Sequence, residues 1–202
     1  MVIGGIYAGF FTPSEAAGVG AISALVLGLA LGRLTLPKVA AALRESVYQS
    51  SMIFAIAVAG KIYVSFIALT GLSNAIGDWI AVTDISMVAV LGLIVIFYLI
   101  LGMFLSPIGI ILLTLPLTIP IVDGYGLSLI WFGVLVVKLL EIGLVTPPIG
   151  LNVFVIKSIV GEKIRLEAIF AGIALFLVAE VVVLGLIAGV PELSLWLPGV
   201  LM

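Results

Sequence analysis

The sequence predicts an all-α integral membrane protein, and three observations lead to this fold class: the composition, the length of the apolar segments and the positions of the prolines. Of 202 residues, 64% are hydrophobic and 9% are charged, and the mean hydropathy is +1.51. An ordinary soluble domain carries about 25% charged residues, so this chain belongs in a bilayer as one membrane unit over residues 1–202. In hydrocarbon the backbone must satisfy its own hydrogen bonds, and a helix does so within one segment.

The residue counts also exclude several functional classes. The formal net charge is −2, so the chain offers no basic face for phosphates, and we expect no nucleic-acid partner. It contains no Cys and no His, which removes thiolate nucleophiles, imidazole bases and the usual ligands of zinc and haem. No two aspartates share a predicted membrane segment. We therefore expect no enzymatic activity and no cofactor.

Three helices are expected in the N-terminal part of the chain. The first is an apolar helix over residues 16–32, and the sequence TPSE at residues 12–15 is a typical start signal with a hydroxyl cap, a proline and an acidic residue. Residues 33–47 mix charged and apolar side chains, which predicts an amphipathic helix lying at the membrane interface. Residues 50–70 are apolar and long enough to cross the bilayer.

Two later segments are too long for one crossing. Residues 86–122 would form a helix of about 55 Å at about 1.5 Å per residue, whereas the hydrocarbon core is about 30 Å thick. The sequence LSPIG at residues 105–109 is the obvious place for a break, so we expect a hairpin there. Residues 127–157 are also too long and are expected to break at residues 146–150. A final crossing is expected over residues 166–190.

The break at residues 146–150 is the most informative passage. Two consecutive prolines remove two backbone donors, so an incoming helix stops near Val145, and Gly150 allows the chain to turn and restart. Unpaired carbonyl groups near residues 143–145 are tolerated in a bilayer only when they are buried, line a cavity or hold a ligand. Broken helices of this kind form ion and substrate sites in secondary transporters. A proline kink without a ligand is the alternative.

The basic residues constrain the topology because six of the eight lie in two clusters, which the positive-inside rule places in the cytoplasm: Arg33, Lys38, Arg44, Lys157, Lys163 and Arg165. The loops at residues 71–85 and 123–126 contain no Lys or Arg and belong on the outer side with the C-terminus. They carry Asp78, Asp84 and Asp123. This topology requires residues 86–122 to form the hairpin. If residues 127–157 formed it instead, the Asp123 loop would lie in the cytoplasm.

Several sequence blocks in a fixed order carry a family resemblance. They are GGIYAGFFTPSEAA at residues 4–17, LGMFLSPIGI at 101–110, LPLTIP at 115–120, WFG at 131–133 and EIGLVTPPIGLNVF at 141–154. The chain resembles the large membrane (permease) subunit of tripartite ATP-independent periplasmic (TRAP) transporters, which carry C4-dicarboxylates, sialic acid and other organic acids. The resemblance covers essentially the whole chain.

The resemblance implies the second inverted repeat of an elevator-type transporter, with one re-entrant hairpin and one broken transmembrane helix. Residues 1–85 would supply scaffold-type helices, and residues 86–158 the transport-type hairpin and broken helix. The implied activity is Na⁺-coupled uptake of an organic acid, C4-dicarboxylate or sialic-acid-like, across a bacterial inner membrane, with the C-terminus in the periplasm. The implied partners are a small membrane subunit, a periplasmic solute-binding protein and the first-repeat half of the large subunit. The lipid bilayer surrounds the membrane parts.

Two alternatives remain open at this point. One is a non-catalytic scaffold or assembly half of a split transporter, and the other is a related anion symporter of the same superfamily. The chain departs from the family pattern at Ser106, where members usually carry Asp, so its hairpin tip offers a hydroxyl rather than a carboxylate to a cation. Coupling to H⁺ is therefore the alternative to coupling to Na⁺. The first repeat is also missing, and a complete large subunit is about twice this length. The chain is then either a C-terminal half or one that needs a separate partner.

Candidate site residues lie at the two breaks. Cation ligands are expected at the hairpin tip and at the end of the first half-helix: Gly102, Ser106, Gly109, Val145, Thr146 and Pro147. Substrate contacts are expected where the helix restarts: Pro148, Gly150 and Asn152. Among these, Thr146 and Asn152 are the polar groups nearest the second break, and neutral oxygens can hold Na⁺ without a permanent desolvation cost.

Four ionisable residues fall inside predicted membrane segments, where each is costly. Lys138 and Glu141 are three residues apart on one helix face, so we expect a structural ion pair that orients the broken helix. Attraction of an anionic substrate by Lys138 is the alternative. Lys61 is expected to pair either with a carboxylate of another chain or with Glu180.

Overall fold

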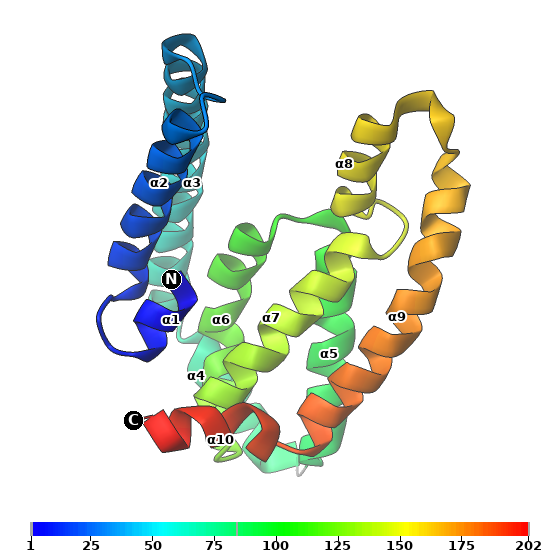
Figure 1. Cartoon of the computed structure of the whole chain (residues 1–202). Helices are drawn as coiled ribbons and strands as arrows, with labels where there is room; N and C mark the ends of the chain where they lie inside the picture. The colour runs from blue at the N-terminus through cyan, green and yellow to red at the C-terminus, as the bar shows by residue number, and fades with distance from the viewer. Residues whose placement is uncertain (1, 84, 202) are drawn as a thin grey trace. The chain divides into compact units, whose positions relative to one another are not determined.

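The computed structural model of the chain describes residues 2–83 and 85–201, and these residues form helices and short connections without a strand (Figure 1). Asp84, which the topology argument counts among the outer acidic residues, lies outside the described residues. The helices are α1 (Val2–Tyr7), α2 (Pro13–Ala30), α3 (Leu36–Thr70), α4 (Leu72–Thr83), α5 (Met87–Phe104), α6 (Pro107–Gly124), α7 (Leu129–Val145), α8 (Leu151–Val160), α9 (Leu166–Gly189) and α10 (Glu192–Leu201), with a 3₁₀ turn η1 (Gly161–Lys163).

The chain divides into two compact units, and the boundary lies inside α3, between Ala55 and Ile56. In the N-terminal unit, α1 packs on α2. The start of α2 is a capping box: Glu15 N donates to Thr12 Oγ1 at 3.4 Å, and Thr12 N donates to Glu15 Oε2 at 2.8 Å. This reciprocal pair satisfies two of the free N–H groups at the helix start, as the TPSE sequence predicts.

The structure differs from the expectation of two separate helices at residues 33–47 and 50–70. Residues 36–47 and 50–70 belong to α3, one helix of 35 residues and about 52 Å. The physical reason lies in the sequence between Lys38 and Ala59, which contains neither Gly nor Pro and therefore nothing that ends a helix. The position of residues 33–47 at the membrane interface stays a prediction.

The hairpin expected over residues 86–122 consists of α5 and α6, joined by residues 105–106, so the helix breaks where LSPIG predicts. Pro107 opens α6, where its missing N–H costs no hydrogen bond.

Within α6, Pro120 cannot donate to the carbonyl of Pro116. The hydroxyl of Ser73, from α4, donates to that carbonyl at 2.9 Å instead. The segment expected as a loop at residues 71–85 is thus mostly α4, which packs on α6.

The core of the C-terminal unit lies where α5, α6 and α7 meet. Figure 1 shows α7 crossing in front of α5, and α7 packs against both α5 and α9. Tyr98 is fully buried; its hydroxyl lies 2.6 Å from Thr114 Oγ1 and 3.2 Å from Thr118 Oγ1, which ties α5 to α6. Trp131 Nε1 donates to the carbonyl of Ile187 at 2.7 Å and ties α7 to α9. Each of these buried polar groups therefore has a partner, as a low-dielectric core requires.

Five of the described helices are long and apolar enough to cross a membrane: Pro13–Ala30, Leu36–Thr70, Met87–Phe104, Pro107–Gly124 and Leu166–Gly189. The last agrees with the crossing predicted over residues 166–190. The protein is therefore an all-helical, multi-pass membrane protein. The inverted repeat, the elevator motion and the re-entrant course of the hairpin stay predictions.

Candidate functional site

The hairpin tip and the broken helix meet at a contact between two glycines. A Cβ atom added to Gly102 would lie 2.9 Å from Gly143 Cα, and one added to Gly143 would lie 2.6 Å from Gly102 Cα. Both distances are shorter than any side chain permits, so α5 and α7 touch backbone to backbone. Because Gly102 lies in the last turn of α5 and Gly143 in the last turn of α7, the link at residues 105–106 lies near the end of α7 (Figure 1).

The end of α7 leaves backbone acceptors unpaired, but not all those expected. Thr146 N donates to Gly143 O at 3.1 Å, so this carbonyl is paired, contrary to the expectation of free carbonyls from residue 143 onward. The carbonyls of Leu144 and Val145 have no hydrogen-bond partner among the described residues, since Pro148 carries no N–H and the chain turns away after Thr146. The unpaired acceptors are therefore Leu144 and Val145.

A hydrogen bond within α7 orients the hydroxyl of Thr146. Its Oγ1 donates to the carbonyl of Ile142 at 2.6 Å, so the hydroxyl proton points into α7. The oxygen lone pairs are then left for an electropositive ligand. Thr146 is half-buried, whereas the adjacent Pro147 and Pro148, joined by a cis peptide bond, are exposed. What the two prolines change is the backbone: neither has an N–H group to donate.

The restart of the helix depends on Gly150. Its φ is +58°, a left-handed conformation that favours glycine, and an added Cβ would lie 3.2 Å from the Phe170 ring. The carbonyl of Gly150 accepts from Val153 N at 2.8 Å and so begins α8. The N–H groups of Leu151 and Asn152 have no partner in the described part of the chain, which gives this helix end a partial positive charge.

The hairpin tip contributes one further hydroxyl. Ser106 is the N-cap residue of α6, yet its side chain makes no capping hydrogen bond and is exposed. The carbonyl of Ser106 accepts from Ile110 N at 3.0 Å and is thereby occupied. Gly109 lies in the first turn of α6, where an added Cβ would meet nothing within 4 Å. Of Ser106 and Gly109, only Ser106 has a polar side-chain atom, and that atom makes no capping hydrogen bond.

Asn152 lines a pocket of about 400 Å³ between α7, α8 and α9. Leu144 and Val145, whose carbonyls are unpaired, line the same pocket, and the charged residues of its lining are Glu141 and Glu180. Two carboxylates beside an amide favour a cation over an organic anion. The role of Asn152 in substrate binding stays a prediction.

Three ionisable side chains form one cluster on α7 and α9. Lys138 Nζ lies 3.1 Å from Glu141 Oε2, the pair expected from the sequence, and 2.6 Å from Glu180 Oε2. The second contact is an ion pair by distance, without the alignment of a hydrogen bond. Glu180 thus pairs with Lys138 rather than with Lys61. With two carboxylates beside it, the ammonium of Lys138 is poorly suited to attract an anionic substrate.

Two contacts of this region were missed by sequence reasoning: the approach of Gly143 to Gly102 and the pairing of Glu180 with Lys138. Gly143 had a signal, since a small residue inside a membrane helix often marks close helix approach. Glu180 carried no local signal, because its partner lies on another helix.

Comparison with known proteins agrees with this architecture. Residues 1–193 match the family described as "Tripartite ATP-independent periplasmic transporter, DctM component". The chain is 32% identical over all of its length to the C4-dicarboxylate TRAP transporter large permease protein DctM of Rhodobacter capsulatus, and covers 46% of that protein. It is 31% identical over 98% of its length to the sialic acid TRAP transporter large permease protein SiaM of Vibrio cholerae, again covering 46%.

A DctM of Pseudomonas aeruginosa is 32% identical over 98% of the chain, with the same 46% coverage. The chain thus spans about half the length of the curated relatives it matches. The match to the family covers nearly every residue described above, including both helix breaks and the Gly102–Gly143 contact. The chain therefore belongs to the DctM family, the large permease component of the tripartite ATP-independent periplasmic transporters.

Proposed function

We propose that this chain is the second-repeat half of a TRAP large permease and that it carries an organic acid together with Na⁺. The observation that carries the proposal is the contact between Gly102 and Gly143, which holds the hairpin tip beside the end of α7. At that end the carbonyls of Leu144 and Val145 and the hydroxyl of Thr146 are acceptors without a donor directed at them. Oxygen acceptors of this kind suit Na⁺, a hard cation.

The anion in this proposal binds at the restart of the helix. The free N–H groups of Leu151 and Asn152 and the positive end of the α8 dipole attract a carboxylate. Acceptors for a cation and donors for a carboxylate then flank residues 146–150. A bound cation would lower the cost of placing the carboxylate there, and this mutual dependence is what coupled transport requires.

The substrate class and the partners follow from the family. Named relatives are permeases for C4-dicarboxylates and sialic acid, so we infer an organic acid of either kind. The remaining parts would be a small membrane subunit, a periplasmic solute-binding protein and the first-repeat half of the large permease, in a bacterial inner membrane. The Lys138 cluster would serve as a structural brace, and the chain would have no enzymatic activity.

Sodium dependence of uptake tests the proposal. Thr146→Val keeps the shape of the side chain and removes the hydroxyl. In the complete transporter reconstituted in liposomes, it should raise the Na⁺ concentration needed for half-maximal uptake of labelled dicarboxylate or sialic acid. Ser158→Ala is the matched control, because that hydroxyl bonds within α8, to the carbonyl of Val155. Equal sodium dependence in both variants and the wild type would contradict a cation site at the break, and would favour a scaffold role.

A further inference from the structure

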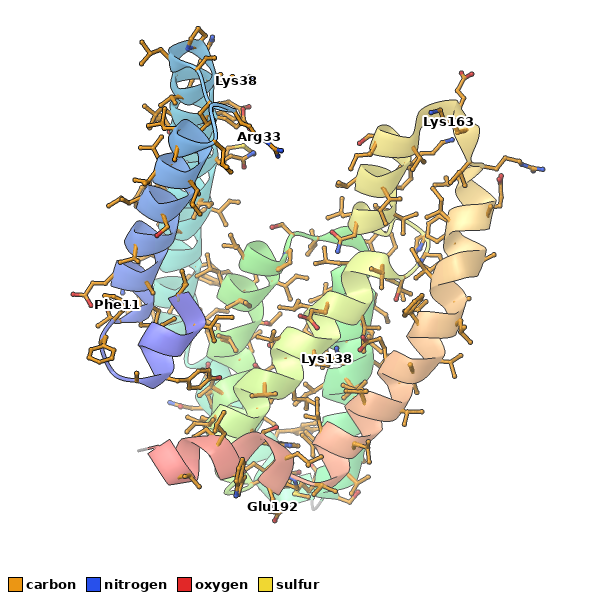
Figure 2. All side chains as sticks on the ribbon, in the orientation of Figure 1. Phe11, Arg33, Lys38, Lys138, Lys163 and Glu192 are labelled. Carbon is orange, nitrogen blue, oxygen red and sulfur yellow. The ribbon has the colours of Figure 1, made fainter. Side chains whose placement is uncertain are left out.

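The Lys138 cluster contains one carboxylate more than its cations balance. Lys138 is largely covered, with 19% of its side chain exposed, and it lies between Glu141 and Glu180. When all three groups are ionised the cluster carries a net charge of −1. Glu141 is the open end of the cluster, because 61% of its side chain is exposed. Figure 2 labels Lys138 about midway along α7.

No other basic residue of the described chain neutralises Glu141. Lys157 donates to the backbone carbonyls of Gly161 and Ile164, and Arg165 pairs with Glu167. Lys61, on α3, forms no ion pair among the described residues. The excess negative charge is therefore a property of the chain as it stands.

An exposed carboxylate at this depth is costly in lipid. Glu141 lies in the last third of α7, followed by the break and α8, so it is well inside the crossing predicted for residues 127–157. Ionised side chains inside membrane segments face protein or water and pair with an opposite charge. The exposed face of Glu141 therefore needs a cover that brings a positive charge.

The surface beside Glu141 has the form of a helix-docking groove. A cavity of about 420 Å³ runs along α7 beside Ile187 of α9. Its lining on α7 follows one helix face and includes both charged groups of that helix: Ile130, Gly133, Val134, Val137, Lys138 and Glu141. Gly133 is exposed, and an added Cβ would meet nothing within 4 Å, so a second helix can approach the backbone closely there.

We propose that this groove is the docking surface for a transmembrane helix of the other half of the large permease, and that a Lys or Arg of that helix pairs with Glu141. The cluster carries one negative charge in excess, so the partner helix has to bring a positive charge. The chain spans about 46% of the length of its permease relatives, so the remaining half is membrane protein that must pack somewhere against this one. The inference rests on the proposed function only in taking the chain to be half of a permease.

Photo-crosslinking in the assembled transporter tests the surface directly. Val137, which is 53% exposed in the groove, is replaced by p-benzoylphenylalanine, and the chain is expressed with the other half and the small subunit. Illumination should give an adduct with the other half of the large permease. An adduct with the small subunit, or labelling of lipid alone, would overturn the proposal. Crosslinking is measured without any transport, so its result holds even if the chain does not carry Na⁺ and an organic acid as proposed.

A charge swap tests the pairing. Glu141→Lys should reduce co-purification of the two halves at least tenfold, and Glu141→Gln should reduce it less. Reversal of one Lys or Arg in the other half to Glu should restore assembly with Glu141→Lys, which a merely misfolded chain could not do. Glu167→Lys is the matched control, since this exposed carboxylate lies at the start of α9. Assembly of Glu141→Lys at the wild-type level would overturn the pairing.

Discussion

Gly102 and Gly143 touch backbone to backbone, and this contact sets how closely the hairpin tip approaches the broken helix. A Cβ atom added to either glycine would lie less than 3 Å from the Cα atom of the other. The neighbour at this distance is backbone rather than a flexible side chain. Relief is therefore possible only by moving α5 away from α7.

The first prediction is that Gly143→Ala separates these two helices. Overpacking of a tight interior contact costs about 1–3 kcal/mol, so we expect a lower unfolding temperature in detergent and impaired uptake. Gly92→Ala, also on α5, is the control, because an added Cβ there meets nothing within 4 Å and alanine favours a helix over glycine. Equal unfolding temperatures for wild type and Gly143→Ala would contradict the close contact.

A second prediction concerns the hydroxyl of Ser73, which replaces the N–H that Pro120 lacks. Ser73→Ala leaves the carbonyl of Pro116 without a partner inside the unit, and we expect a loss of about 1–3 kcal/mol of stability, measured by unfolding in detergent. Pro120→Ala should lessen this cost, because the alanine introduced there brings an N–H that can donate to Pro116 within α6. Ser65→Ala is the control, since that hydroxyl bonds within its own helix. Additive effects of Ser73→Ala and Pro120→Ala would contradict this account.

The helix breaks could be predicted from the sequence, whereas the contacts across helices could not. Pro107 and the Pro147–Pro148 pair remove backbone donors locally, so the ends of α5 and α7 follow from neighbouring residues alone. The Ser73–Pro116 hydrogen bond joins residues 43 positions apart, and a pattern of local spacing carries no information about it.

In the candidate site, too, local features could be predicted from the sequence and contacts between helices could not. The sequence indicated Thr146 and Gly150, because the acceptor and the turn residue belong to the break itself. It missed the partner of Lys138 on α9, since Lys61 and Lys138 are equivalent candidates for Glu180 until the helices are placed. The continuous α3 was missed for another reason: charge indicated an interfacial segment, but charged residues do not end a helix.

A third prediction concerns the cation at the hairpin tip. Ser106→Asp adds a carboxylate where the side chain makes no hydrogen bond, and an added charge at about 4 Å contributes on the order of 1–4 kcal/mol. The Na⁺ concentration for half-maximal uptake by the complete transporter should therefore fall. Ser158→Asp, on the exposed part of α8, is the charge control. Unchanged sodium dependence would show that the tip is not a cation ligand or that protons drive transport.

A fourth prediction fixes the topology by cysteine labelling, for which the chain is suited because it contains no Cys. Single cysteines at Asp78, Asp123 and Glu192 should react with a membrane-impermeant maleimide added from the periplasmic side. Cysteines at Lys38 and Lys163 should react only after the cytoplasmic side is opened. The physical reason is the retention of basic segments in the cytoplasm. Labelling of Asp123→Cys from the cytoplasm alone would show that residues 86–122 do not form the hairpin of this topology.

The last prediction addresses the break between α7 and α8, the centre of the proposed site. Pro147→Ala with Pro148→Ala restores two backbone donors, which can pair with Gly143 and Leu144 and extend α7 by a further turn. The acceptors for the cation then disappear into the helix, so uptake should be lost while the protein still inserts and unfolds cooperatively. Gly150→Leu should have a similar effect by a different route, because leucine is strained at a φ of +58° and would collide with Phe170. Uptake by liposomes with and without a Na⁺ gradient is the measurement, and near-normal, sodium-coupled uptake by the double proline variant would remove the break from the mechanism.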